Sequence, residues 1–233
     1  MIAFALAASA LAFVLSAAAG LGGSLILVPA LSLVYGVKEG VALAAILLAG
    51  NNIAKVVAYR RTLPIKAASG VLALTILGSF LGAELLVRSP ERVVQVAVVL
   101  AIVLGFAAER LRLTTAPRFS AGLLALVAGL TSGFSGTSGP LKGLALRRLD
   151  FDRMHLVGAA SAVSLASDAV KGAVYLRAGL VDREAWVVVL ACVLLMPIAT
   201  LTGRRINRQV GEAAYSGLFW TVMMGYTLRL LVR

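Results

Sequence analysis

Long apolar runs separated by short charged segments constrain this chain more than any other feature of its sequence. A helix of about 20 residues crosses the roughly 30 Å of hydrocarbon in a bilayer. Six runs approach that length: 41–59, 67–87, 93–109, 154–175, 185–202 and 213–229. The composition agrees, with 61% of the 233 residues in the set AVILMFWYC and 14% charged, against about half and about a quarter in soluble domains. The sequence therefore predicts an all-α integral membrane protein and excludes an ordinary soluble domain.

Two further apolar stretches, 1–35 and 119–146, do not fit one crossing each, because both are interrupted by glycine. The first breaks at Gly20-Leu21-Gly22-Gly23-Ser24, and the second between Gly133 and Pro140, where glycines and a proline disfavour a continuous helix. The remainder of the first stretch, Leu25 to Tyr35, covers about half a bilayer as a helix. We therefore expect each stretch to form a re-entrant helical hairpin. A signal peptide is the alternative for 1–19, but no basic segment precedes the apolar run.

The chain repeats itself at an offset of 116 residues. The matched pairs are Gly20 with Gly136, Gly23 with Gly139, Lys55 with Lys171, Tyr59 with Tyr175 and Arg61 with Arg177. Weak internal symmetry of this kind is typical of transporters. The sequence therefore predicts a first transmembrane repeat over 1–112 and a second over 113–233, joined in one transporter domain.

The distribution of Lys and Arg indicates how the repeats are arranged, since cytoplasmic loops carry the excess. If each broken stretch returns to its starting side, thirteen of the loop cations, Lys142 among them, lie on one face and seven on the other. If each stretch crossed once, the division would be ten against ten. The hairpin interpretation is therefore favoured. Each half then crosses an odd number of times, so the two repeats are inverted, each a broken hairpin plus three transmembrane helices, and both termini face outside.

The two breaks are candidate anion sites. A helix N-terminus presents unpaired backbone N–H groups and about half a positive charge, so half-helices starting near Ser24 and Pro140 could bind an oxyanion. The candidate substrate-binding residues at the breaks are Gly22, Gly23, Ser24, Thr137, Ser138 and Gly139. The alternative is that these small residues only allow close helix packing.

Two lysines, Lys55 and Lys171, lie inside apolar runs, where a charge is costly and is a functional candidate by default. Spacings of three and four residues place each on one helix side with polar neighbours. In the first half these are Asn51 and Asn52, and in the second Ser164, Ser167 and Asp168. The further candidate substrate-binding residues are therefore Asn51, Asn52, Lys55, Ser167 and Lys171. Asp168 is also the candidate proton-coupling group. The alternative is that the lysines extend to the membrane interface, with Lys171 neutralising Asp168.

Other titratable residues suggest no further chemistry. Glu84 and Arg88 have the spacing of a local ion pair, and His155 is expected to be structural. A metal site is not expected, because His155 and Cys192 are the only residues of their types and lie far apart. No triad, Walker A or other enzyme signature is present. We therefore expect no cofactor and no enzymatic activity, and the net charge of +12 is not interpreted as a nucleic-acid site, because no basic patch is interleaved with aromatics.

The glycine-rich break followed by an apolar run and proline, here Gly20 to Pro29 and again Gly133 to Pro140, resembles the sulfite exporter TauE/SafE family over essentially the whole chain. The resemblance implies a membrane transporter of sulfite, sulfonates or related anions. The family's glycine signature carries over to Gly20, Gly22, Gly23, Gly136 and Gly139. The chain departs from the usual G-x-G-G-G run at Ser24, Ser138 and Pro140.

Together these features predict a secondary transporter in the cytoplasmic membrane that moves a small sulfur-containing oxyanion by alternating access, with its site at the repeat interface. Its expected partners are the anion and the lipid bilayer, and a homo-oligomer is left open. A passive anion channel and a membrane scaffold subunit without transport activity are the alternatives.

Overall fold

The computed structural model describes residues 2–19, 23–110, 121–137 and 139–206, and this part of the chain is all helical. Its helices are α1 (Ile2–Ala19), α2 (Gly23–Tyr35), α3 (Val37–Ala58), α4 (Ile65–Arg88), α5 (Glu91–Arg110), α6 (Ala121–Ser135), α7 (Gly139–Arg147), α8 (Arg153–Arg177) and α9 (Arg183–Ile206). A 3₁₀ turn, Arg60–Thr62, joins α3 to α4. The expectation of an all-α fold is therefore confirmed for the described ranges.

Five of the six expected spans coincide with long helices: α3, α4, α5, α8 and α9. Two of these, α3 and α4, combine the length and the apolar character of a membrane-crossing helix, with mean hydropathies of 1.8 and 2.0. The sixth expected span, 213–229, lies outside the described residues. The fold is thus compatible with an integral membrane protein.

Short helices follow both breaks, as a half-crossing requires. At 1.5 Å per residue, α2 with 13 residues is about 20 Å long and α7 with nine residues about 14 Å. The second break is shorter than the sequence indicated, because α6 continues through Gly133 and ends at Ser135. Gly136 then has a φ of 77°, which a residue with a side chain adopts only under strain.

The helix bounds follow the same offset of 116 as the sequence repeat. Residue 19 ends α1 and residue 135 ends α6, while α2 and α7 begin at 23 and 139, and α3 and α8 at 37 and 153. Residues 207–233, where the offset would place an equivalent of α5, lie outside the described residues.

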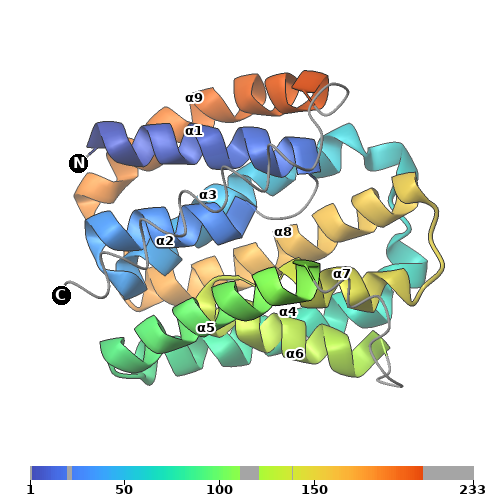
Figure 1. The fold of residues 1–233 in the computed structure, drawn as a ribbon, viewed down its shortest axis with the longest axis horizontal. Helices are drawn as coiled ribbons and strands as arrows, with labels where there is room; N and C mark the ends of the chain where they lie inside the picture. Colours follow the sequence, from blue (N-terminus) through green and yellow to red (C-terminus); the bar gives the residue numbers. More distant parts are fainter. Residues whose placement is uncertain (1, 20–22, 111–120, 138, 207–233) are drawn as a thin grey trace.

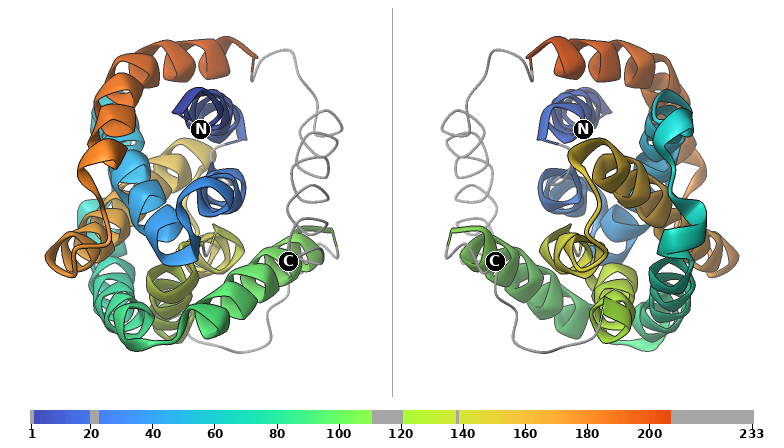
Figure 2. Two further views of the ribbon diagram at one scale, coloured as in Figure 1. Left: turned by 90° about the vertical axis from the view of Figure 1, so that its left-hand side faces the viewer. Right: turned by 90° about the vertical axis from the view of Figure 1, so that its right-hand side faces the viewer.

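The helices form three pairs along the bundle (Figures 1 and 2). One side holds α1 against α9, the opposite side holds α4 against α6, and α3 crosses α8 between them. The α4–α6 contact is the closest, because Gly78 and Gly82 face Gly129 and Gly133. A Cβ atom on any of these four glycines would overlap backbone atoms of the opposite helix. Such small-residue seams let helices associate in a membrane, where no hydrophobic force drives them together.

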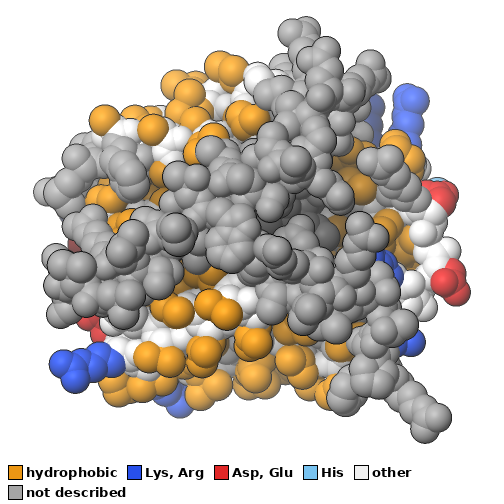
Figure 3. Space-filling model, viewed as in Figure 1, with side chains coloured by type: hydrophobic (Ala, Val, Ile, Leu, Met, Phe, Trp, Pro, Cys, Tyr) orange, Lys and Arg blue, Asp and Glu red, His pale blue; other side chains and the backbone are white. Residues whose placement is uncertain are grey.

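Apolar side chains cover much of the outer surface along α4, α5 and α9. Leu85, Leu104, Leu190, Leu194 and Ile198 are each more than half exposed. On the face in Figure 3, most of the charged side chains shown lie toward the two ends of the bundle, and apolar side chains lie between them. An apolar surface this extensive would favour association in water, whereas lipid tails solvate it.

Candidate functional site

The two breaks meet in the structure. The hydroxyl of Ser24, in the first turn of α2, lies 3.1 Å from the hydroxyl of Thr137, just before α7. A Cβ atom on Gly136 would lie 2.8 Å from Cγ2 of Val28, so the second break packs directly on α2. The N-termini of the two half-helices therefore lie near one another. Gly23 and Gly139 begin those helices, whereas Gly22 and Ser138 lie outside the described residues.

The polar side of α8 contacts the second break through Lys171. Its ammonium forms an ion pair with Oδ1 of Asp168 at 2.8 Å. It also donates to Oγ of Ser132 at 3.1 Å and to the carbonyl oxygen of Gly136 at 3.3 Å. Because Lys171 is only 1% exposed, the alternative in which it extends to the membrane interface is wrong. The other part of that alternative, neutralisation of Asp168 by Lys171, is what the structure contains.

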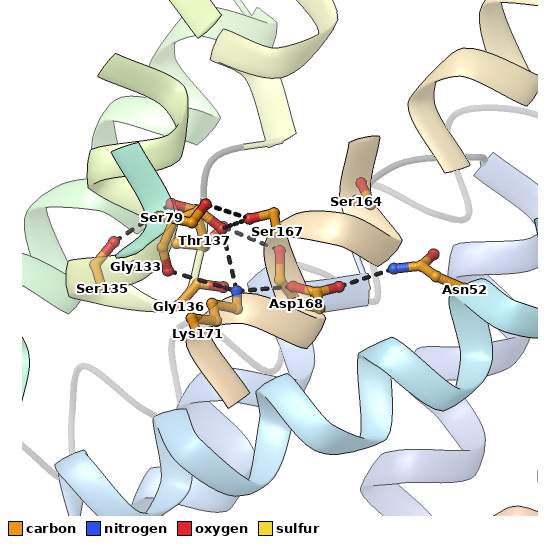
Figure 4. Close-up of polar contacts among 12 residues, drawn as sticks. Asn52, Ser79, Gly133, Ser135, Gly136, Thr137, Ser164, Ser167, Asp168 and Lys171 are labelled. Carbon is orange, nitrogen blue, oxygen red and sulfur yellow. Dashed lines mark hydrogen bonds and ion pairs between the residues drawn. The ribbon is translucent and has the colours of Figure 1, made fainter. Parts of the chain in front are cut away.

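Asp168 also connects the two central helices. Its Oδ2 accepts a hydrogen bond of 2.8 Å from Nδ2 of Asn52 on α3, and Figure 4 shows the carboxylate between Asn52 and Lys171. Asn52 and Asp168 are 116 residues apart, which is the offset of the sequence repeat. Two residues separated by the offset of the sequence repeat are thus directly hydrogen-bonded to one another.

A chain of serines extends the polar contacts toward α4 and α6. Ser167 lies 2.7 Å from the hydroxyl of Ser79 and donates to the hydroxyl of Ser132 at 3.2 Å. One turn along α8 from Lys171, the hydroxyl of Tyr175 donates to the carbonyl of Gly133. We refer to Asn52, Ser79, Ser132, Ser167, Asp168 and Lys171 as the buried polar cluster, since each is at most 5% exposed.

Asn51 and Lys55 add two further polar side chains from α3. Lys55 is buried and lies close enough to Asp168 for their charges to interact. Asn51 is fully buried, and neither its amide nitrogen nor its amide oxygen has a hydrogen-bond partner. An unpaired buried polar group costs about 1–3 kcal/mol, so a ligand that accepts from the amide nitrogen of Asn51 would relieve the cost at that nitrogen.

Sequence reasoning missed three members of the site. Ser79 and Ser132 are uncharged and lie among small residues on apolar helices, so nothing in the pattern separated them from packing residues. Lys142 was counted as a loop cation, but it is 7% exposed and donates to the hydroxyl of Ser164 at 3.4 Å. The sequence did contain one signal for its burial, which is that Lys142 lies only three residues after Gly139. A side chain so close to the start of a half-helix lies near the break and not in a loop.

The arrangement is suited to holding a small anion without covalent chemistry. Buried ammonium groups, hydroxyls, amides and two half-helix N-termini are all hydrogen-bond donors or sources of positive potential. Within the described residues, no group of three or more His, Cys, Asp or Glu side chains could hold a metal ion.

Two ion pairs outside the site are local. Arg88 contacts Glu84 at 3.1 Å, which confirms the expected pair, and the arginine is largely exposed. Asp152 accepts from the backbone N–H groups of Met154 and His155 and so caps α8, and its carboxylate lies 2.7 Å from Nδ1 of His155. The structural role expected for His155 agrees with this contact.

Residues 5–230 match the protein-family model described as Sulfite exporter TauE/SafE. No curated protein and no solved structure matches the chain at a significant level.

Proposed function

The chain belongs to the sulfite exporter TauE/SafE family, a family of membrane transporters, and from this premise we propose that it carries a small sulfur-containing oxyanion across the cytoplasmic membrane by alternating access. The family membership itself gives a transporter of the sulfite-exporter type. The identity of the anion, the site and the mechanism are our proposal.

The observation that carries the site is the meeting of the two breaks. Ser24 and Thr137 bring the N-termini of α2 and α7 together, and Lys171 bonds to the carbonyl of Gly136 in the same break. Two half-helices that converge on one point concentrate positive potential there, as broken helices do in transporters whose substrates are anions. Gly22, Gly23, Ser138 and Gly139 would let an oxyanion approach the backbone closely.

Inverted repeats would explain the packing of the bundle. Helix α4 of the first half packs on α6 of the second, and α9 of the second half packs on α1 of the first. The offset makes α1 equivalent to α6 and α4 equivalent to α9, so these two contacts are the same contact made twice. The Asn52–Asp168 bond would then lie on the axis that relates the halves.

Different side chains would bind the anion and couple its transport to protons. Asn51, Ser24 and Thr137 would donate to the anion, and Lys55 would supply positive charge. Asp168 is the proposed proton-coupling group, because protonation would weaken its contact with Lys171 and with Asn52 and so loosen α3 from α8. Ser167 would orient Asp168 and Lys171 through the serine chain.

Uptake into proteoliposomes tests the proposal. We would compare sulfite, sulfate, thiosulfate and methanesulfonate, each with and without an imposed pH gradient. We expect saturable flux of at least one of these anions. The flux should respond to the pH gradient in the wild type but not in Asp168→Asn. Glu84→Gln is a matched control, since it removes a carboxylate from a surface ion pair of the same protein.

Two outcomes would contradict the proposal in different ways. Flux that does not saturate and ignores the pH gradient would identify a passive channel. If none of the four anions moved, while Lys55→Met left the cellular role of the protein intact, a scaffold role would replace transport.

A further inference from the structure

The one buried lysine that the sequence assigned to a loop is Lys142. It is the fourth residue of α7, in the first turn after the second break. Its ammonium has a neutral hydrogen-bond partner, the hydroxyl of Ser164 on the polar side of α8, at 3.4 Å. An ammonium carries three N–H donors, so one long bond to a hydroxyl leaves most of its charge to be balanced by other groups.

Asp168 does not provide that balance alone. Lys142 lies close enough to Asp168 and to Lys171 for their charges to interact, but both oxygens of Asp168 are already engaged. Oδ1 pairs with Lys171 at 2.8 Å, and Oδ2 accepts from Asn52 at 2.8 Å. Lys142 and Lys171, both buried, therefore share this one carboxylate.

An excess of buried positive charge is costly inside a membrane protein unless an anion compensates it. The offset of 116 places Lys142 opposite Ile26, which is a buried apolar residue of α2, so this lysine has no counterpart in the first half. A doubly charged anion near the first turn of α7 would interact with Lys142 more strongly than a singly charged one, because Coulomb energy is proportional to the charge of the ligand.

We propose that Lys142 is a further anion-binding residue of this site, and that its charge makes the site select doubly charged over singly charged oxyanions. This inference rests on the proposed function and narrows it, because it favours sulfite or thiosulfate over a monovalent sulfonate.

Binding to the purified, detergent-solubilised protein tests the charge preference. The probes are sulfite at mildly alkaline pH and thiosulfate as dianions, and methanesulfonate as a monoanion, all at matched ionic strength, with titration calorimetry as the readout. The wild type should bind both dianions more tightly than methanesulfonate. Equal or tighter binding of methanesulfonate would overturn the inference without any variant.

The variant Lys142→Met removes the charge at nearly constant length. Coulomb energy is proportional to the charge of the ligand, so the logarithm of the affinity loss should be twice as large for a dianion. A loss of about tenfold for methanesulfonate would correspond to a loss of about a hundredfold for thiosulfate. Lys142→Arg, which keeps the charge, should retain the preference. Lys66→Met, at an exposed lysine of α4, should change neither affinity.

The outcomes separate this inference from the proposed function. Lys142→Met, if it elutes as a single species, can lose affinity equally for monoanions and dianions or lose none. Either result would give Lys142 a structural role and leave the transporter proposal intact. If the wild type bound none of the three probes, the proposed function would fail first, and the charge preference with it.

Discussion

Lys171 distributes its N–H donors over groups from three segments of the chain. Asp168 lies on the same helix, Ser132 on α6 and the Gly136 carbonyl in the break after α6. Gly136 directly follows Ser135, the last residue of α6. The lysine therefore fixes the geometry of the break as well as the position of the Asp168 carboxylate, so part of its importance is structural.

Removing one member of this buried pair should cost more than removing both. Asp168→Asn leaves Lys171 as an uncompensated buried charge, which typically costs about 3–5 kcal/mol. The double variant Lys171→Met with Asp168→Asn should unfold at a higher temperature than Asp168→Asn alone. Thermal unfolding in detergent measures this. Additive losses in the double variant would mean that the two charges do not depend on each other.

The N-cap of α8 predicts a stability difference that depends on pH. Asp152 accepts a hydrogen bond from the backbone N–H of His155, and this bond holds the pKa of the Asp152 carboxylate below its usual value. A hydrogen bond from the side chain of His155 adds to this effect. Because the folded-state pKa is depressed, the contribution is present above the unfolded-state pKa and is lost as the pH falls through the folded-state pKa. We expect Asp152→Ala to lower Tm at neutral pH and to approach the wild type in acid.

Asp152→Asn is the matched control, because asparagine also caps helices but does not titrate. Unfolding curves from neutral to strongly acid pH would compare the three proteins. A constant difference between Asp152→Ala and the wild type across that range would remove the carboxylate from the explanation.

At the scale of elements, the seam between α4 and α6 is the tightest contact of the bundle. Gly78 shows why, since a Cβ atom there would overlap the carbonyl oxygen of Leu126 and lie 2.8 Å from the backbone nitrogen of Leu130. Backbone atoms cannot move aside as the end of a flexible side chain can. Side chains on either helix would therefore separate the two helices rather than repack.

Two glycines of α4 should respond oppositely to alanine. Gly78→Ala should destabilise the protein by about 1–3 kcal/mol, as overpacking does. At Gly70 a Cβ atom would meet nothing within 4 Å, so Gly70→Ala should stabilise the helix by up to about 1 kcal/mol. Thermal unfolding of the two variants in one detergent measures the contrast. Similar behaviour of both would show that the seam is looser than the structure has it.

The same seam explains what the sequence could and could not predict. Runs of apolar residues predicted α3, α4, α5, α8 and α9 well, because a helix that crosses a membrane must satisfy all its own backbone groups. The exact end of α6 was not predictable from the glycines alone. Gly133 lies within the helix, where it packs on α4, whereas Gly136, also a glycine, follows the end of the helix with a positive φ. A single sequence contains no signal for which glycine meets a neighbour. For Lys142 the sequence contained one signal, its position three residues after Gly139 at the start of α7.

At the scale of the whole molecule, the breaks of the two halves contact each other through Ser24 and Thr137. Alternating access by rocking one half against the other would change that contact. A disulfide there should therefore hold the protein in one state. Cys192, the only native cysteine, is buried in α9 and offers little background.

The double variant Ser24→Cys with Thr137→Cys tests this motion. After mild oxidation we expect at least a tenfold loss of anion flux in proteoliposomes, with recovery when a reductant is added. Each single variant, treated in the same way, controls for effects of the substitutions themselves. Full flux in the oxidised double variant would show that the two breaks stay fixed to one another during transport.

The pairing of α1 with α9 has a consequence for how the chain is made. Ala19 ends α1 and Arg183 begins α9, so a ribosome adds more than 160 residues between the end of one helix and the start of its neighbour. At about 5–20 residues per second this takes on the order of ten to thirty seconds. During that time the face of α1 that later meets α9 must be covered by lipid, by the insertion machinery or by helices that will be displaced. Biogenesis of this protein therefore includes a late step in which α1 receives a neighbour made more than 160 residues after it.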